Sequence, residues 1–279
     1  IIEMVAAFKQ AFEEKDFVVT AEVGPPQGTE ISELKEHIDL LKDKVDGLNV
    51  TDNQSSVMRI SSLAICRVIL DHGGEPILQL TCRDRNRIGM QSDLMGASAL
   101  GITNLLCLSG DHQTFGVHPG AKNVYYIDSL HLLQLGRSMR DEGKFLGGDE
   151  IKRPPQMFVG AAANPFADPF EIRVPRLAKK VAAGVEFIQT QCIYNLDKFE
   201  EWMKGVRDRG LHEKCFILAG LTPMKSVGMA KYMQKRVPGM DVPEEVIKRL
   251  QGVEKGKQAD EGIKMCIESI QRLKECEGV

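Results

Sequence analysis

The chain has 279 residues, 43% of them hydrophobic and 27% charged, which allows a large folded core and excludes a predominantly disordered protein. A net charge of −3 at pH 7 excludes a general electrostatic attraction to nucleic acid or anionic membranes. No apolar run could span a bilayer and no signal-peptide pattern opens the sequence, so we expect a cytoplasmic protein without a membrane span. The first residue, Ile1, is not Met, which leaves the true N-terminus open.

Short apolar, β-branched runs recur along the chain, each followed by a polar, glycine or proline break. This pattern predicts seven strands, at 17–23, 47–51, 76–82, 103–109, 157–163, 187–192 and 214–221. Amphipathic stretches between them predict helices at 30–44, 57–72, 128–142, 170–183 and 196–209. Glycine is the usual residue for a left-handed helix end, and we expect such ends at Gly73, Gly101, Gly143, Gly184 and Gly210.

Strands bracketed by helices are expected to be parallel and buried, as in an open doubly wound sheet or a closed barrel. No GxGxxG follows the first strand, which favours a (β/α)8 barrel forming one domain over residues 1–279. The seventh strand is followed by a short helix, a loop at 238–243 and a long helical stretch to about Cys276. We therefore expect the eighth strand to be missing from this sequence or to follow Val279.

The cysteines and histidines show no metal-binding pattern. The seven cysteines include no CxxC pair, and the six histidines include no HExxH spacing. We interpret the cysteines as reduced thiols, most of them core residues, and we predict no metal site.

In a (β/α)8 barrel, the active site forms at the carboxyl ends of the strands. Polar residues or glycine occur at these positions, whereas the strand interiors are expected to be apolar; they are Glu22, Thr51, Thr81, Asp84, Gly110, Asp111, Asn164 and Gln191. Solvent exposure at strand ends is an equally good explanation for Thr51, Thr81 or Asn164 taken alone.

Glu22 is the candidate general acid. It lies between an apolar run and a rigid Gly-Pro-Pro turn, where a carboxyl group can have a raised pKa. Asp111 follows an apolar strand and Gly110, although a turn or helix cap explains it as well. Lys179 and Lys180 are either a solvated helix face or, in the right fold, ligands of a phosphate group.

These residues also carry a resemblance to the methylenetetrahydrofolate reductase family, particularly its bacterial members. The resemblance covers nearly the whole chain, and its short motifs occur in the family's order. They are Glu22-Val23-Gly24-Pro25-Pro26, Asn49-Val50-Thr51, Gln79-Leu80-Thr81-Cys82-Arg83-Asp84, Ser109-Gly110-Asp111, Tyr126, Asn164-Pro165, Lys180, Thr190-Gln191 and Gly220-Leu221-Thr222-Pro223.

The resemblance implies a flavoenzyme of one-carbon metabolism that binds FAD, or FMN, without covalent attachment. Reduced flavin would transfer hydride to 5,10-methylenetetrahydrofolate, giving 5-methyltetrahydrofolate in a reversible reaction. Glu22 would be the general acid, and Asp111 and Gln191 would contact the folate. The flavin site would comprise Thr51, Gln79, Ser109, Gly110, Asp111, Tyr126, Asn164 and Lys180.

Four positions depart from the family pattern: Gln79 replaces a histidine, Ser109 an arginine, and Met229 and Met233 stand where some members have Gln and Phe. The electron donor is therefore open between NAD(P)H and a partner such as ferredoxin. We expect a homo-oligomer or a complex with a companion subunit, acting in methionine biosynthesis or acetyl-CoA synthesis.

Two other functions share this fold. A pterin-binding methyltransferase would need no flavin, and a barrel could serve a redox complex as a non-catalytic subunit. The presence of Glu22, Asp111 and Gln191 together argues against the non-catalytic alternative.

Overall fold

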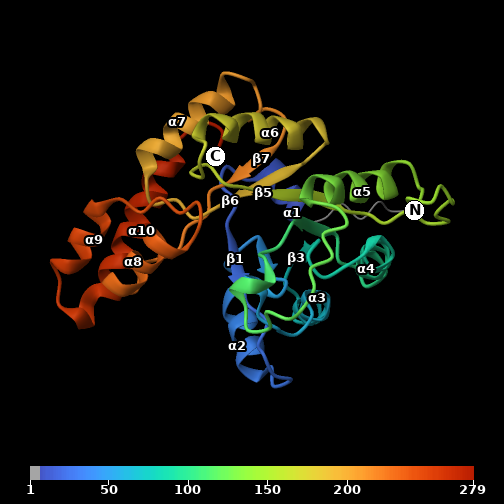
Figure 1. The fold of residues 1–279 in the computed structure, drawn as a ribbon, viewed down its shortest axis with the longest axis horizontal. Helices are drawn as coiled ribbons and strands as arrows, with labels where there is room; N and C mark the ends of the chain where they lie inside the picture. The colour runs from blue at the N-terminus through green and yellow to red at the C-terminus, as the bar shows by residue number, and fades with distance from the viewer. Residues whose placement is uncertain (1–6) are drawn as a thin grey trace. The chain divides into compact units, whose positions relative to one another are not determined.

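A computed structural model describes residues 7–279, so the first six residues of the predicted 1–279 domain lie outside the described residues. Its seven strands, all close to the predicted positions, are β1 (Thr20–Val23), β2 (Gly47–Val50), β3 (Pro76–Thr81), β4 (Asn104–Leu108), β5 (Phe158–Ala163), β6 (Phe187–Thr190) and β7 (Phe216–Leu218). They form one sheet in the order β1-β2-β3-β4-β5-β6-β7 (Figure 1).

Helices follow the strands along the chain. The α helices are α1 (Ala7–Glu14), α2 (Ser32–Leu41), α3 (Ser62–Asp71), α4 (Arg87–Ala99), α5 (Ser129–Asp141), α6 (Arg173–Ala182), α7 (Leu196–Arg207), α8 (Val227–Arg236), α9 (Glu244–Gln251) and α10 (Gln258–Lys274). Short 3-10 helices are η1 (Gln54–Ser56), η2 (Gln113–Phe115), η3 (Phe170–Ile172) and η4 (Lys255–Lys257). Parallel strands in sequential order, alternating with helices, confirm the predicted α/β barrel class and exclude the doubly wound order. Residues 219–279 add no eighth strand.

The chain divides into two compact units. Unit 1 holds the described residues up to Ala161 together with Ala183–Val185, and unit 2 holds Ala162–Ala182 and Glu186–Val279. In unit 2, α8, α9 and α10 lie together (Figure 1), around a hydrophobic cluster of Met224, Ala230, Val242, Ile247 and Leu250.

The strand registers in unit 1 separate an apolar face from a polar one. Val23, Val50, Leu78, Leu105 and Val159 stand opposite one another on adjacent strands, and all are buried. A Cβ added to Gly136 of α5 would contact Leu105 and Val159, so this row faces the helices. Since side chains alternate along a strand, the neighbouring positions face the opposite side.

That opposite face carries polar side chains inside the strands. Asn49 and Gln79 are only 6% and 8% exposed, and Asn49 stands opposite Glu22 in the register. Our prediction of uniformly apolar strand interiors is therefore wrong at these two positions. Polar groups on this face lead directly to the carboxyl ends of β1, β2 and β3.

All five glycines predicted to end helices have left-handed backbones, with φ between 61° and 86°: Gly73, Gly101, Gly143, Gly184 and Gly210. The helical stretch predicted after the 238–243 loop consists of two helices, because α9 ends at Gln251 and α10 begins at Gln258. The range of helix α4 was not predicted, although the helix end at Gly101 was. It contains Gly89 and Gly96, which weaken its helical pattern, but the Asn86 side chain accepts a hydrogen bond from the Gly89 N–H at 2.9 Å.

Helix α1, which was not predicted, packs across the amino-terminal ends of the strands in unit 1. Phe8 is fully buried, with its ring centroid 5.9 Å from that of Phe158, the first residue of β5. Gly47 at the start of β2 leaves room for this ring, since an added Cβ would lie 3.1 Å from Phe8. The aromatic contact closes the end of the strands opposite to the polar residues.

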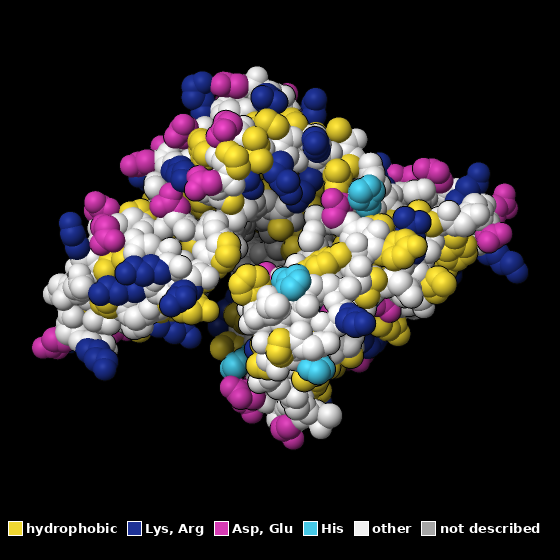
Figure 2. Space-filling model, in the orientation of Figure 1, with side chains coloured by type: hydrophobic (Ala, Val, Ile, Leu, Met, Phe, Trp, Pro, Cys, Tyr) yellow, Lys and Arg dark blue, Asp and Glu magenta, His cyan; other side chains and the backbone are white. Residues whose placement is uncertain are grey.

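All seven cysteines are free, in agreement with the interpretation as thiols. Basic and acidic side chains are intermixed on the face shown in Figure 2. Among the described residues, no helix has the length and apolar composition needed to cross a membrane.

Candidate functional site

A cavity of about 280 Å³ opens at the carboxyl ends of β2, β3 and β4 in unit 1. It is lined by Thr51, Asp52, Asn53, Gln54, Gln79, Thr81, Arg83, Leu108, Ser109, Gly110 and Asp111. Five of the predicted flavin residues are thus brought together: Thr51, Gln79, Ser109, Gly110 and Asp111.

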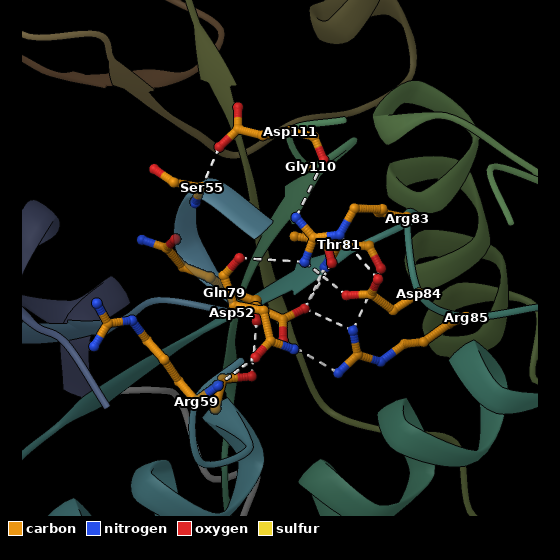
Figure 3. A network of polar contacts seen from close by, with 12 residues as sticks. Asp52, Ser55, Arg59, Gln79, Thr81, Arg83, Asp84, Arg85, Gly110 and Asp111 are labelled. Carbon is orange, nitrogen blue, oxygen red and sulfur yellow. Dashed lines mark hydrogen bonds and ion pairs between the residues drawn. The ribbon is translucent and has the colours of Figure 1, made fainter. Parts of the chain in front are cut away.

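Asp52 is the centre of a hydrogen-bond network beneath this cavity (Figure 3). Its Oδ2 accepts from the Thr81 backbone N–H at 2.8 Å, from Thr81 Oγ1 at 2.9 Å and from Arg85 Nη1 at 2.6 Å. The Asp52 side chain is 1% exposed, so its carboxylate is a buried charge that hydrogen bonds from Thr81 and Arg85 compensate. The network holds the ends of β2 and β3 together.

Arg83 connects the loops that follow β2 and β4. Its side chain is 2% exposed and donates to the backbone oxygens of Asp111 and Asn53, each at 3.2 Å. Its remaining donors bind the Asp84 carboxylate at 2.6 and 2.9 Å. A buried guanidinium that spans two loops fixes their separation, and with it the width of the cavity.

The loop after β2 has an unusual backbone. Asn53, Ser55 and Ser56 have left-handed φ values of 45°, 55° and 59°, which side-chain-bearing residues seldom adopt. One carboxylate oxygen of Asp111 accepts from the Ser55 N–H at 3.2 Å (Figure 3). Such a backbone is stable only when surrounding residues hold it in place. Here Asp111 and Arg83 do so through their hydrogen bonds to the loop.

Gly110 is required where it stands. Its φ is +87°, and an added Cβ would lie 3.0 Å from the Thr81 Cβ and 3.1 Å from the Arg83 Cβ. The glycine therefore lets β4 end against β3 without closing the cavity. The Ser109 hydroxyl, next to it, accepts from the Ser129 N–H at 3.2 Å and so orients the start of α5.

Substituting Gly110→Ala should destabilise the protein by about 1–3 kcal/mol, through the left-handed backbone and the crowded Cβ. Gly148→Ala is the matched control, because Gly148 has φ +96° but open space around it. Urea unfolding of both variants separates the two contributions. Equal losses of stability would contradict the steric part of the prediction.

Thr51 supplies an observation that favours a bound ligand. Its hydroxyl is buried, with the residue 2% exposed, and finds no hydrogen-bond partner within residues 7–279. A buried polar atom without a partner is costly unless something binds it. Thr51 lines the cavity, so a ligand with polar ring or hydroxyl atoms, as a flavin has, fits this wall.

Glu22 lies near the same carboxyl-terminal edge of the sheet, one residue before the end of β1. The side chain is exposed at the surface, yet the protein around its carboxyl raises the pKa through desolvation, and a hydrogen bond from Gln54 partly opposes that rise. Gln54 also lines the cavity. A raised pKa is the property that a general acid needs near neutral pH.

Tyr126 lies outside the cavity. It is 60% exposed and stacks under the Arg87 guanidinium, which lies 4.7 Å from the ring centroid. The two residues line a separate open groove together with Tyr125, Ile127, Asp128 and His131. Tyr125 links groove and cavity, since its hydroxyl donates to the Gly110 backbone oxygen at 3.0 Å.

The remaining predicted residues belong to unit 2: Asn164 follows β5, Gln191 follows β6, and Lys180 lies on α6. The Asn164 side chain accepts from the Phe166 and Ala167 N–H groups at 3.0 and 3.1 Å, and Lys180 Nζ donates to the Ala162 backbone oxygen. The Gln191 side chain accepts from the Cys192 N–H at 3.1 Å. All three residues are only partly buried.

Comparison with known proteins places these residues in a family. The family model described as methylenetetrahydrofolate reductase matches residues 7–279. The chain belongs to this family.

Two curated relatives carry the same description. A probable methylenetetrahydrofolate reductase (NADPH) of Caenorhabditis elegans is 25% identical over 76% of this chain. Methylenetetrahydrofolate reductase 2 of Schizosaccharomyces pombe is 27% identical over 73% of it. The matches span only 30% and 31% of those relatives, which are much longer proteins.

Solved structures share the fold at low sequence identity. A protein from Clostridium thermocellum, described as binding two copies of 5-methyl-5,6,7,8-tetrahydrofolic acid, is 14% identical, with a TM-score of 0.60 over 96% of this chain and 88% of that one. A 2,3-dimethylmalate lyase is 14% identical, with a TM-score of 0.51 over 97% of this chain and 95% of that one. At these identities the likeness concerns the fold alone.

The two methionines that depart from the family pattern pack inside unit 2. Met229 and Met233 contact its hydrophobic cluster, and the Met233 sulfur accepts from the Tyr194 hydroxyl at 3.3 Å. These side chains thus stabilise α8 against its neighbours.

The sequence analysis did not single out Asp52, Gln54 or Arg85. A usable signal was present, because Arg83-Asp84-Arg85 places alternating charges directly after a buried strand, and Asp52 follows a predicted site residue. Charges at such positions are expected to pair with one another.

Proposed function

We propose that this protein is a flavin-dependent methylenetetrahydrofolate reductase, which converts 5,10-methylenetetrahydrofolate to 5-methyltetrahydrofolate. The observation that carries the proposal is Glu22, a carboxyl group with a raised pKa at the end of β1, in a chain that the family model matches throughout its described length. That is the position and the protonation behaviour required of a proton donor to the folate.

The cavity in unit 1 would hold the flavin. The unpartnered Thr51 hydroxyl, the Gln79 side chain and the Ser109-Gly110-Asp111 turn offer hydrogen-bonding groups to a polar ring system, and Gly110 allows close approach. Bound flavin supplies the hydride that protein side chains cannot provide. The flavin would be FAD, with FMN as the alternative, and Tyr126, Asn164 and Lys180 would be further contacts.

Glu22 would hold a proton and release it as the methylene bridge of the folate opens. Asp111 and Gln191 would orient the pterin through hydrogen bonds, and Asp111 is already held by the Ser55 N–H. Folate binding by this chain is supported by the family membership, and the related fold of the Clostridium thermocellum protein is described with a methylated folate bound.

The electron donor is proposed to be NAD(P)H or a partner protein such as ferredoxin. NADPH appears in the description of the Caenorhabditis elegans relative, of which this chain matches 30%. A single catalytic domain, a cytoplasmic location, an oligomer or companion subunit, and a place in methionine or acetyl-CoA synthesis complete the proposal.

The test is the visible spectrum of the anaerobically purified protein before and after addition of 5-methyltetrahydrofolate. We expect an oxidised flavin band that bleaches, because the proposed reaction is reversible. A flavin that does not bleach would indicate another flavoenzyme. A colourless protein that neither FAD nor FMN reconstitutes would overturn the proposal and favour the methyltransferase or the non-catalytic subunit.

A further inference from the structure

The side chain of Gln191, the proposed folate contact in unit 2, is held by its own backbone. Its Oε1 accepts from the Cys192 N–H at 3.1 Å. This N–H belongs to the peptide unit that links Gln191 to Cys192, so the orientation of that unit decides where the side-chain amide lies. The contact engages the amide oxygen and leaves the amide nitrogen as the donor for a ligand.

Thr190 fixes the same peptide unit from its other side. Thr190 is the last residue of β6 and is only 9% exposed, and its hydroxyl donates to the Gln191 backbone oxygen at 3.0 Å. In a planar trans peptide the C=O and the N–H point in opposite directions, so a bond to the oxygen also sets the direction of the Cys192 N–H. The Thr190 hydroxyl is therefore connected to the Gln191 amide through one rigid plane.

The loop after β7 holds this hydroxyl in place. The Gly220 N–H donates to Thr190 Oγ1 at 2.9 Å, and the Gly220 backbone oxygen accepts from the Ile193 N–H at 2.9 Å. An added Cβ on Gly220 would lie 2.5 Å from the Thr190 backbone oxygen, so a residue with a side chain could not approach so closely. Because the hydroxyl accepts from Gly220, its own hydrogen is directed to the Gln191 oxygen.

Other contacts hold the segment after β6 without this hydroxyl. The Gln191 N–H donates to the Ala163 backbone oxygen at 2.8 Å, at the end of β5. On the opposite side, Cys192 Sγ lies 3.1 Å from Thr222 Oγ1, and the Tyr194 hydroxyl donates to the Thr222 backbone oxygen at 3.0 Å. Loss of the threonine hydroxyl is therefore expected to release the Gln191 peptide unit without unfolding the segment.

We propose that Thr190 is a positioning residue for folate binding, whose hydroxyl orients the peptide unit after Gln191 and with it the amide that contacts the pterin. The inference rests on the proposed function, in which Gln191 binds the folate. The position requires a group that accepts from the Gly220 N–H and donates to the Gln191 oxygen at the same time. A hydroxyl does both, whereas the equally shaped side chain of valine does neither.

The test is Thr190→Val, with the binding of tetrahydrofolate to the purified protein measured by anaerobic calorimetry. Tetrahydrofolate carries the pterin ring and has no methyl group to transfer, so binding is observed without reaction. We expect the dissociation constant to rise about tenfold, the loss that corresponds to one well-oriented hydrogen bond. Ser226→Ala is the control, because its hydroxyl also accepts a backbone N–H, that of Met229 at 3.1 Å, and should leave the affinity unchanged.

A double-mutant cycle separates positioning from a purely structural role. Gln191→Ala alone should weaken tetrahydrofolate binding about tenfold, since the contact itself is removed. Adding Thr190→Val to Gln191→Ala should cause little further loss, because Thr190 acts through the side chain that is already absent. A threonine that only held β6 and β7 together would weaken binding equally in both backgrounds.

A second pair of variants decides the question if Thr190→Val does not fold. Thr190→Ser keeps the hydroxyl and should bind tetrahydrofolate as wild type does. Thr190→Ala lacks the hydroxyl and should show the roughly tenfold loss expected of the valine variant. Both variants lack the threonine methyl group, so the difference between them measures the hydroxyl.

Wild-type affinity in Thr190→Val, or additive losses in the double variant, would overturn the inference and leave the proposed function intact. A serine variant that binds as weakly as the alanine variant would overturn it as well. A wild-type protein that binds no tetrahydrofolate would refute the proposed function, and the inference with it. The failure of the inference alone is therefore distinguishable from the failure of both.

Discussion

Replacing Glu22 with glutamine is expected to slow folate reduction roughly 10²–10⁴-fold, the usual contribution of a positioned general acid. The amide matches the carboxyl in size, so the fold and the cavity should persist. Flavin binding should also persist, because Glu22 is not among the residues that line the cavity. The measurement is single-turnover oxidation of the reduced enzyme by 5,10-methylenetetrahydrofolate.

The direction in which the rate of folate reduction changes with pH can also be predicted. Desolvation by the protein around the carboxyl raises the pKa of Glu22, so the proton-donating form persists to higher pH than for an ordinary glutamate, and the rate should fall as pH rises through the raised value. That alkaline limb should vanish in Glu22→Gln. Glu36→Gln, an exposed residue of α2, should keep both rate and limb. An unchanged rate in Glu22→Gln would remove Glu22 from the mechanism.

The same pKa shift predicts a change in stability. A carboxyl whose pKa is raised in the folded state stabilises the protein below its unfolded pKa, and this contribution is lost as pH rises through the folded value. Glu22→Gln should therefore unfold at a slightly higher temperature than wild type at neutral pH. Below the unfolded pKa the difference should disappear.

Most of the fold follows from local sequence patterns. Buried parallel strands read as short apolar runs, and glycine marks the helix ends because left-handed backbones such as Gly101 and Gly184 disfavour other residues. The start of helix α4 was not predicted, because the stability of this helix depends on a cap at Asn86 and on the burial of Met90 and Leu94. Local propensity carries little of that information.

The candidate site was predictable in part for a similar reason. Thr51, Gly110 and Asp111 stand at strand ends, which parallel topology brings to one side of the sheet. The ion pair between Asp52 and Arg85 was not predictable, because the two residues are 33 positions apart in the sequence and no short spacing connects them. Ion pairs of this kind depend on which strands become neighbours in the sheet. The pattern of residues along the sequence does not contain this information.

The Asp52–Arg85 pair should contribute more to stability than any exposed ion pair of this protein. Substituting Asp52→Ala leaves the Thr81 N–H and hydroxyl without an acceptor and removes one of the two carboxylates that bind Arg85, the other being Asp93. Removing one partner of a buried pair typically costs about 3–5 kcal/mol. The measurements are the urea midpoint and hydrogen exchange at the end of β3.

The double substitution Asp52→Ala with Arg85→Met separates the loss of a contact from the burial of an unpaired charge. It should be more stable than Asp52→Ala alone, because methionine fills much of the same volume and carries no charge to be desolvated. Asp71→Ala is the control, since Asp71 pairs with Arg67 on the exposed face of α3 and should cost less than about 1 kcal/mol. If Asp52→Ala costs no more than Asp71→Ala, the buried network does not hold β2 and β3 together, and the width of the cavity must depend on Arg83 alone.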